Sequence, residues 1–303
     1  MKRRTFIQQA TAGTALATIG GLGLQSFTSL ESVEKITILH TNDVHSHIDA
    51  FGPEDGRNAN KGGVARRASL IDGIRKDNPN TLLLDAGDIF QGTPYFNYYG
   101  GELEFKLMSK LKYDAATIGN HDFDNGIEGL YAQLPHAKFQ FISANYDFSN
   151  TIMDTHTKPY KVFKKGNIKI GVFGLGIELE GLVDPAMFKE TKYLDPIETS
   201  QEMTRILKTE NQCDLIICLS HLGYHYKYDK ISDLKLAEAT RNIDLIIGGH
   251  THTFLSKPTV VKNIDGKNML VNQVGCYGIN LGKIDFYFDN VKNKSANGTS
   301  IIV

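Results

Sequence analysis

Residues 35–45 read Lys35-Ile36-Thr37-Ile38-Leu39-His40-Thr41-Asn42-Asp43-Val44-His45, a short β-rich apolar run followed directly by a cluster of polar side chains. Similar apolar runs recur at 81–84, 115–118, 168–173, 215–219 and 245–247. Several are continuously apolar, as expected of strands that are covered on both faces. Segments with helical spacing lie between them, at 64–76, 102–111, 197–209 and 234–241. Strands that alternate with helices predict an α/β architecture.

The C-terminal part of the chain differs from this pattern. Residues 258–288 lose the helical spacing and predict antiparallel β structure, with a hairpin turn at 263–267 and a closing strand at 283–288. Residues 289–303 are polar, and we expect a frayed tail there. The pattern therefore predicts one domain over residues 35–288, followed by a polar tail.

Paired arginines, Arg3 and Arg4, stand just ahead of a weakly apolar run at 10–24. A helix over that run would be about 22 Å long, shorter than the roughly 30 Å hydrocarbon core, so no stable transmembrane span is expected. A basic start followed by a short apolar run is typical of an export signal, here similar to the twin-arginine type. We therefore expect residues 1–30 to direct the chain to the periplasm or another extracytoplasmic location, and either to be cleaved or to remain as an anchor.

The composition limits the classes of function. The 303 residues include 33 basic and 34 acidic side chains, a formal net charge of −1, which excludes the basic footprint of a protein that binds nucleic-acid duplexes. The length fits about two average domains or one large α/β domain. Without residues 1–30 the chain has 30 basic and 34 acidic residues, a net charge of −4. An anionic substrate would therefore need a local positive site.

Five of the predicted strands are each followed directly by Asp, Asn or His. These clusters lie at 40–45, 85–88, 119–124, 220–223 and 248–252. Open α/β sheets build their sites at this carboxyl edge of the strands. The clusters contain seven candidate metal ligands: Asp43, His45, Asp88, Asn120, His221, His250 and His252.

Carboxylate, amide oxygen and imidazole are ligands for divalent cations such as Zn, Mn, Fe or Co, and Mg or Ca stay open. Asp43 and His45, like His250 and His252, are two residues apart, and on an ideal strand such residues share one face. Seven ligands are too many for one tetrahedral site but suit two metals that share a carboxylate. Two divalent cations and two carboxylates would leave a charge of about +2, which suits a phosphate dianion.

The order Asp-x-His, Gly-Asp, Gly-Asn-His-Asp, a lone His after an apolar strand and Gly-His-x-His resembles the calcineurin-like metallophosphatases. More narrowly, residues 38–45, 87–94, 119–124 and 246–253 look like the 5′-nucleotidase branch. The resemblance covers residues 35 to about 288. It implies a four-layer αββα sandwich of two mixed β-sheets flanked by helices.

The resemblance also implies roles for individual residues. One metal would be held by Asp43, His45, Asp88 and His252, and the other by Asp88, Asn120, His221 and His250, with Asp88 bridging. His121 with Asp124 resembles the catalytic dyad, and Asn120 and His121 would contact the substrate. The branch often has Gln where this chain has His252, a difference that bears on metal preference.

The implied function is an exported metal-dependent phosphoesterase that hydrolyses nucleoside 5′-monophosphates or related phosphoesters by in-line attack of a metal-bound hydroxide. A 2′,3′-cyclic-nucleotide phosphodiesterase or UDP-sugar hydrolase is an alternative, and so is a metal-binding subunit that needs a partner. Two-domain members of the branch carry a C-terminal domain that binds the base, for which 303 residues leave no room. A separate chain would then carry that domain, or the enzyme would be broad. The aromatic stretches 95–99 and 224–228 could stack on a base, cover core or face a partner.

Overall fold

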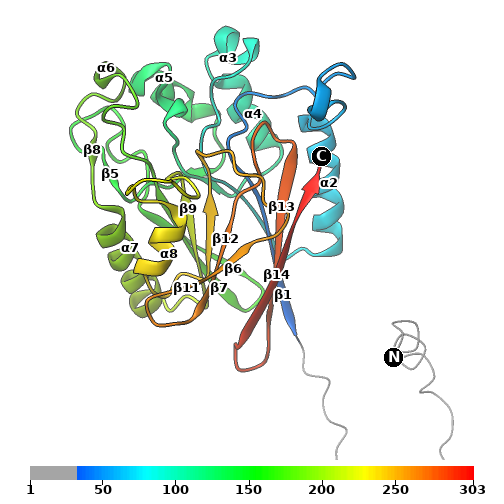
Figure 1. The fold of residues 1–303 in the computed structure, drawn as a ribbon, viewed down its shortest axis with the longest axis vertical. Helices are drawn as coiled ribbons and strands as arrows, with labels where there is room; N and C mark the ends of the chain where they lie inside the picture. The colour runs from blue at the N-terminus through cyan, green and yellow to red at the C-terminus, as the bar shows by residue number, and fades with distance from the viewer. Residues whose placement is uncertain (1–32) are drawn as a thin grey trace, which may run out of the picture. The chain divides into compact units, whose positions relative to one another are not determined.

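Two six-stranded sheets form the centre of the molecule (Figure 1). The structure, a computed structural model, describes residues 33–303. The predicted export signal therefore lies outside the described residues. Among residues 33–303, no helix is long and apolar enough to cross a membrane.

The first sheet has the order β14-β13-β1-β2-β3-β4. Its strands are β14 (Lys294–Ile302), β13 (Asn280–Phe288), β1 (Glu34–Thr41), β2 (Thr81–Asp85), β3 (Ala115–Ala116) and β4 (Gln140–Phe141). The strands from β1 to β4 run parallel, whereas β13 is antiparallel to β1 and to β14. The sheet is therefore mixed, and the parallel part places the ends of β1, β2 and β3 at one edge.

The second sheet has the order β11-β12-β10-β9-β7-β6. Its strands are β11 (Thr259–Lys262), β12 (Asn268–Asn272), β10 (Leu245–Gly248), β9 (Leu215–Ser220), β7 (Ile168–Leu175) and β6 (Tyr160–Lys165). The four central strands are parallel, and both edge strands are antiparallel to their neighbours. A separate pair joins β5 (Tyr146–Asp147) to β8 (Lys192–Tyr193).

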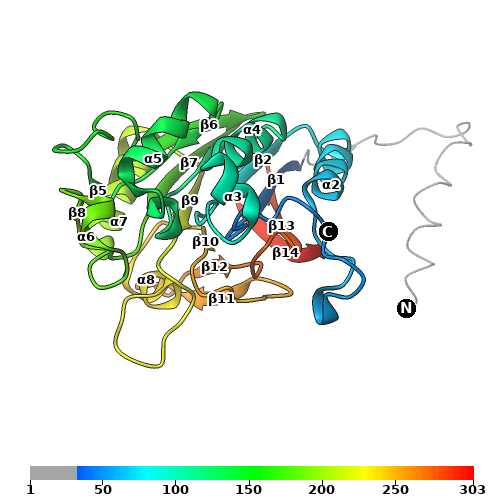
Figure 2. The same cartoon turned by 90° about the horizontal axis from the view of Figure 1, so that it is seen from above.

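Helices cover the outer face of each sheet, as Figure 2 shows from above. On the side of the first sheet lie α2 (Val64–Asp77), α3 (Pro94–Tyr99), α4 (Glu102–Lys110) and α5 (Gly126–Gln133). On the side of the second lie α7 (Pro196–Arg205), which continues as a π turn at Ile206–Glu210, and α8 (Asp233–Ala239). The shorter helical segments are Gly56–Asn58, His121–Phe123, Leu134–His136 and α6 (Pro185–Phe188).

Three apolar clusters fill the spaces between these four layers. The alternation of side chains along a strand assigns each residue to one of them. In β2, for example, Leu83 packs with Phe105 under the helices, whereas Leu82 and Leu84 lie between the sheets. Because both faces are buried, the strand has to be apolar throughout, as in the sequence. The predicted four-layer sandwich of two mixed sheets is confirmed.

The C-terminal prediction is wrong for the tail and incomplete for the segment before it. Residues Lys294–Ile302 are not frayed but pair with β13 over their whole length. The side chain of Asp289 accepts hydrogen bonds from two amides of the turn, and Gly62 N donates to Val303 O at 2.8 Å. An edge strand is held by its backbone, so polar side chains do not prevent it. Within 258–288, the hairpin forms in the second sheet, but the closing strand β13 joins the first.

Candidate metal centre

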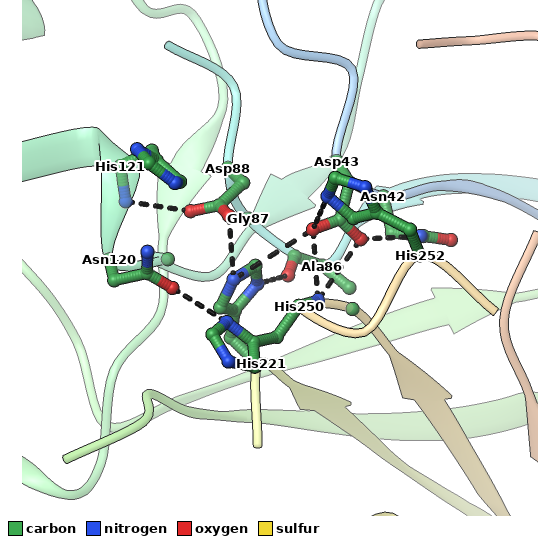
Figure 3. Close-up of polar contacts among 12 residues, drawn as sticks. Asn42, Asp43, Ala86, Gly87, Asp88, Asn120, His121, His221, His250 and His252 are labelled. Carbon is green, nitrogen blue, oxygen red and sulfur yellow. Dashed lines mark hydrogen bonds and ion pairs between the residues drawn. The ribbon is translucent and has the colours of Figure 1, made fainter. Parts of the chain in front are cut away.

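The seven predicted ligands come together where the parallel strands of both sheets end, and Figure 3 labels all of them except His45. Ligand atoms of Asp43, His45, Asp88 and His252 lie within 4.8 Å of one another, and so do those of Asp88, His221 and His250. Asp88 belongs to both groups, in the position that a bridging carboxylate requires. Three of the contributing loops follow strands of the first sheet and two follow strands of the second.

The fully buried ring of His221 faces the shared carboxylate. Its Nδ1 lies 2.6 Å from the carbonyl oxygen of Ala86 and its Nε2 lies 3.0 Å from Oδ2 of Asp88. Because a carbonyl oxygen only accepts, Nδ1 carries the proton that it donates. Nε2 then needs either a second proton or a cation between it and the carboxylate, which fits a metal ligand.

In the first ligand group, too, a ring nitrogen faces another group that cannot donate to it unless it carries a proton. His45 places Nδ1 3.1 Å from the carbonyl oxygen of Phe90, while its Nε2 lies 3.0 Å from Nε2 of His252. Two neutral imidazole nitrogens that both offer lone pairs at this distance repel each other. A proton or a cation between them removes the repulsion, so this pair also fits a metal.

Asn120 and His250 complete the second group. The amide oxygen of Asn120 lies 2.8 Å from Nδ1 of His250. The backbone N of His250 donates to both carboxylate oxygens of Asp43, at 2.9 and 3.1 Å. The loop after β10 is thereby held against the loop after β1, across the gap between the two sheets.

The charges of the centre call for a cation. Burial alone would lower the pKa of His221, but the carboxylates of Asp88 and Asp43 raise it to about 10. Burial likewise opposes protonation of His252, yet its hydrogen bonds with Asp43 and Cys276 raise its pKa to about 10. Burial would raise the pKa of Asp88, but His221 holds it well below its usual range. Protons thus balance the carboxylates where divalent cations would do so in a metal-loaded site.

His121 and Asp124 lie beside this centre. Nδ1 of His121 is 2.9 Å from Oδ2 of Asp124, and the backbone N of His121 donates to Oδ1 of Asp88 at 2.8 Å. The hydrogen bond with Asp124 raises the pKa of His121, against the effect of partial burial. Because Nδ1 is paired with Asp124, Nε2 is the nitrogen of this half-exposed ring that is left to contact another group.

Asp43 and His45 are expected from their spacing to share one face of a strand, and so are His250 and His252. This prediction is wrong. These residues do not lie on strands: β1 ends at Thr41 and β10 at Gly248. All four have positive φ, between 49° and 70°. The side chains therefore meet in tight turns, which the sequence spacing could not distinguish from a strand.

Three residues outside the predicted site support it. The buried carboxylate of Asp122 accepts hydrogen bonds from the backbone of both loops that carry Asp88 and Asn120. The side chain of Asn42 donates to Oδ2 of Asp43 at 2.6 Å. The ring of Tyr277 lies 6.0 Å from that of His45. Asp122 and Asn42 lie inside the polar clusters, whereas Tyr277 follows no motif.

The aromatic stretches 95–99 and 224–228 make contacts elsewhere. The hydroxyl of Tyr95 donates to Asp49 and that of Tyr226 to the carbonyl oxygen of Leu222. In the part of the chain that the structure describes, no ring of either stretch pairs with a ring of the seven predicted ligands. Stacking on a base therefore stays one of three open interpretations of these stretches, beside core packing and contact with a partner.

Comparisons with known proteins agree with this geometry. Residues 36–254 match the calcineurin-like phosphoesterase family. The chain is 35% identical over 280 residues to a snake venom 5′-nucleotidase of Crotalus adamanteus, covering 86% of this chain and 46% of the relative. It is 36% identical over 292 residues to the 5′-nucleotidase of Homo sapiens, covering 89% and 49%.

A solved structure shows the same arrangement over the described fold. The 5′-nucleotidase precursor from Thermus thermophilus superposes with a TM-score of 0.80 at 35% identity, over 89% of this chain and 55% of that chain. The chain thus spans about half the length of the curated relatives it matches. With the family match over most of the described residues, the five motifs and the shared fold, the chain belongs to the calcineurin-like phosphoesterase family.

Proposed function

We propose that this domain is a metal-dependent phosphoesterase that hydrolyses nucleoside 5′-monophosphates or related phosphoesters. The observation that carries the proposal is the pair of His/Asp groups that share Asp88, with His121 and Asp124 directly beside them. The 5′-nucleotidase names of the similar proteins support the choice of substrate class. Because the chain spans only about half of those relatives, their substrate is proposed for this chain and is not carried over as a fact.

Two divalent cations fit the residues present. Asp43, His45, Asp88 and His252 would hold one, and Asp88, Asn120, His221 and His250 the other. The pair of cations would supply Lewis-acid charge for the phosphoryl oxygens. The chain itself orients the ligands: Ala86 fixes the tautomer of His221, and the backbone N of His121 fixes one oxygen of Asp88.

His121 is the proposed acid of the site. Asp124 occupies Nδ1 and raises the pKa of the ring, so that the imidazole keeps a proton on Nε2 at higher pH. From there it can donate a hydrogen bond to a phosphoryl oxygen or protonate the leaving alkoxide. Asn120, the residue before His121, would also contact the substrate through its side-chain amide.

A substrate panel tests the reaction and its alternatives. Purified protein with Mn²⁺ is assayed on AMP, 2′,3′-cyclic AMP, a UDP-sugar and a chromogenic phosphate, with a chelator as the blank. We expect AMP to be hydrolysed fastest, and His121→Gln to lose activity while keeping its metal. Faster turnover of the cyclic nucleotide or UDP-sugar would favour the alternative enzymes. No turnover of any substrate with two metals bound would refute the enzyme proposal.

The metal-binding-subunit alternative has its own basis, because the relatives are about twice as long as this chain. A partner chain would then supply substrate recognition. Activity on AMP that appears only after a partner is added would favour it. Activity of the isolated chain on several unrelated phosphoesters would favour a broad, self-sufficient enzyme.

We also propose that residues 1–30 export the chain through a twin-arginine route, on the basis of Arg3 and Arg4 ahead of the short apolar run. A folded reporter fused behind residues 1–35 should reach the periplasm. Arg3→Lys with Arg4→Lys should keep it in the cytoplasm, whereas Lys2→Arg should not. Export that ignores the arginine pair would refute the assignment.

A further inference from the structure

A groove of about 570 Å³ opens beside the candidate metal centre, and its lining includes Arg57, Lys61, Phe254, Tyr277 and Ile302. These residues come from the loop before α2, the loop before β11, the loop after β12 and the end of β14. The groove therefore forms where four segments distant in sequence meet.

Tyr277 connects the groove to the centre. Its backbone N donates to the carbonyl oxygen of Asp43 at 2.7 Å, and its ring lies 5.9 Å from the ring of His252. A phosphoester whose phosphate sits at the first ligand group has this groove next to it. The groove is thus placed to receive the part of the substrate beyond the phosphate.

Phe254 gives the groove a fixed aromatic surface. Its ring rests on the backbone of Gly275, where an added Cβ would lie 2.2 Å from ring atom Cε1. Phe254 is nevertheless 49% exposed. One side of the ring is held by the backbone while the rest stays accessible, which is the arrangement that lets a nucleobase stack.

Two cations border the same groove. Arg57 is exposed and Lys61 half-buried, and Lys61 Nζ donates to the carbonyl oxygen of Arg57 at 2.7 Å. Within residues 33–303 neither forms an ion pair with a carboxylate, and none of the described lining residues is acidic. Unneutralised cations in a chain with excess acid make this groove complementary to an anion.

We propose that this groove binds the remote part of the substrate and selects nucleotides that carry a second phosphate, the base lying on Phe254 and the second phosphate near Arg57 and Lys61. The inference rests on the proposed phosphoesterase function for its choice of substrate. The binding itself can be measured without turnover.

Binding is tested with adenosine 3′,5′-bisphosphate, AMP and ribose 5-phosphate. Calorimetry on Mn²⁺-loaded His121→Gln protein gives Kd values with little hydrolysis. We expect the bisphosphate to bind about tenfold more tightly than AMP, the size of effect that two partly exposed charge contacts provide. Arg57→Gln with Lys61→Gln should remove this difference and leave AMP unchanged.

Two further variants separate charge from stacking. Lys164→Gln with Lys262→Gln removes the same charge at exposed positions on the two edge strands of the second sheet, and should keep the tenfold difference. Phe254→Ala should weaken AMP at least about fivefold but leave ribose 5-phosphate unchanged, because only AMP has a base to stack.

Equal Kd values for AMP and the bisphosphate, or an undiminished difference in the Arg57/Lys61 variant, would overturn the proposal. If wild-type protein hydrolyses AMP in that case, the phosphoesterase function stands and only the groove assignment fails. If the binding differences appear but nothing is hydrolysed, the groove assignment stands and the enzyme function fails. A dimer that Phe254→Ala dissociates would mean that a second copy covers the groove, which also overturns it.

Discussion

The carboxylate of Asp122 ties the loop after β2 to the loop after β3. Its Oδ2 accepts hydrogen bonds from Gly119 N at 2.8 Å and Asp88 N at 3.1 Å. Its Oδ1 accepts from Ile89 N at 2.9 Å and Phe90 N at 3.2 Å. The side chain is fully buried, so water cannot replace these bonds. Asp122→Asn should therefore destabilise both the fold and the metal centre.

The size of the effect follows from the four bonds. An asparagine keeps the shape but turns one acceptor oxygen into an NH₂ group, so whichever way the amide turns, two backbone N–H groups lose their acceptor. A hydrogen bond to a charged group contributes about 1.5–3 kcal/mol, so the two lost bonds together amount to about 3–6 kcal/mol. That is a large part of the roughly 5–15 kcal/mol by which a typical domain is stable. Removal of the buried charge beside Asp88 offsets part of this loss.

The assay is urea unfolding at pH 8 with and without Mn²⁺. Burial and the charge of Asp88 raise the pKa of Asp122 to about 7, so its carboxylate is mostly ionised at pH 8. The matched control is Asp124→Asn, the same change two residues later at a partly exposed position. It should alter the free energy of unfolding by less than about 0.5 kcal/mol.

Metal titration gives the second readout. Because Asp122 holds the backbone of Asp88, Asp122→Asn should weaken Mn²⁺ binding about 10–100-fold, as loss of a ligand-orienting group does. If Asp122→Asn and Asp124→Asn unfold at the same urea concentration and bind Mn²⁺ with the wild-type affinity, these amide contacts do not hold the centre together.

Three other outcomes are expected. Asp124→Asn removes the negative charge and weakens the hydrogen bond that raise the pKa of His121, so kcat should fall at least about 100-fold and the alkaline limb of its pH profile should move to lower pH; an unmoved limb would contradict the pairing. By metal analysis, His252→Gln, which offers an amide oxygen, should keep two equivalents of Mn²⁺ and His252→Ala only one; equal metal contents would argue against ligation. Burial lowers the pKa of His40 to about 3, below its unfolded value of about 6.5, so the folded state binds fewer protons between these pH values. Wild-type protein should lose about 2 kcal/mol more stability than His40→Gln between pH 6.5 and pH 5 in urea unfolding, and parallel losses would refute this.

The strands that the sequence predicts are those with both faces buried. In β9 all six residues are buried, and no polar position interrupts the run before Ser220. The unpredicted strand β6 is an edge strand with partly exposed side chains, three of them lysines. Such a strand gains its stability from backbone pairing, which leaves no apolar pattern to read.

The unpredicted helix α5 has a different cause. It contains Gly126 and Gly129, which lower helix propensity by about 1 kcal/mol each relative to alanine. At Gly129 an added Cβ would lie 2.5 Å from Cβ of Asn125, so packing at the start of the helix favours glycine there. Tertiary contacts, rather than local preference, therefore set this element.

The seven candidate ligands were predictable because residue type and position after a strand carry the signal. The groove was not, because Arg57, Phe254 and Tyr277 meet only through the packing of loops. Gly119 combines both cases. Its place in a motif is visible in the sequence, but the reason for glycine is not: an added Cβ there would lie 2.2 Å from Oδ1 of Asp88.

The backbone of the candidate ligands is itself an argument for function. Five of the seven have positive φ: Asp43, His45, Asp88, His250 and His252. Each such residue costs about 1 kcal/mol or more, so together they cost an amount comparable to the stability of a domain. Hydrogen bonds from Asp43 N to Gly87 O and from His45 N to Asp88 O hold the turns in place. Glycine at these positions would relieve the strain but would remove the imidazoles and carboxylates. The sequence keeps strained turns and closely spaced imidazole nitrogens at one sheet edge, a combination that bound cations would make favourable.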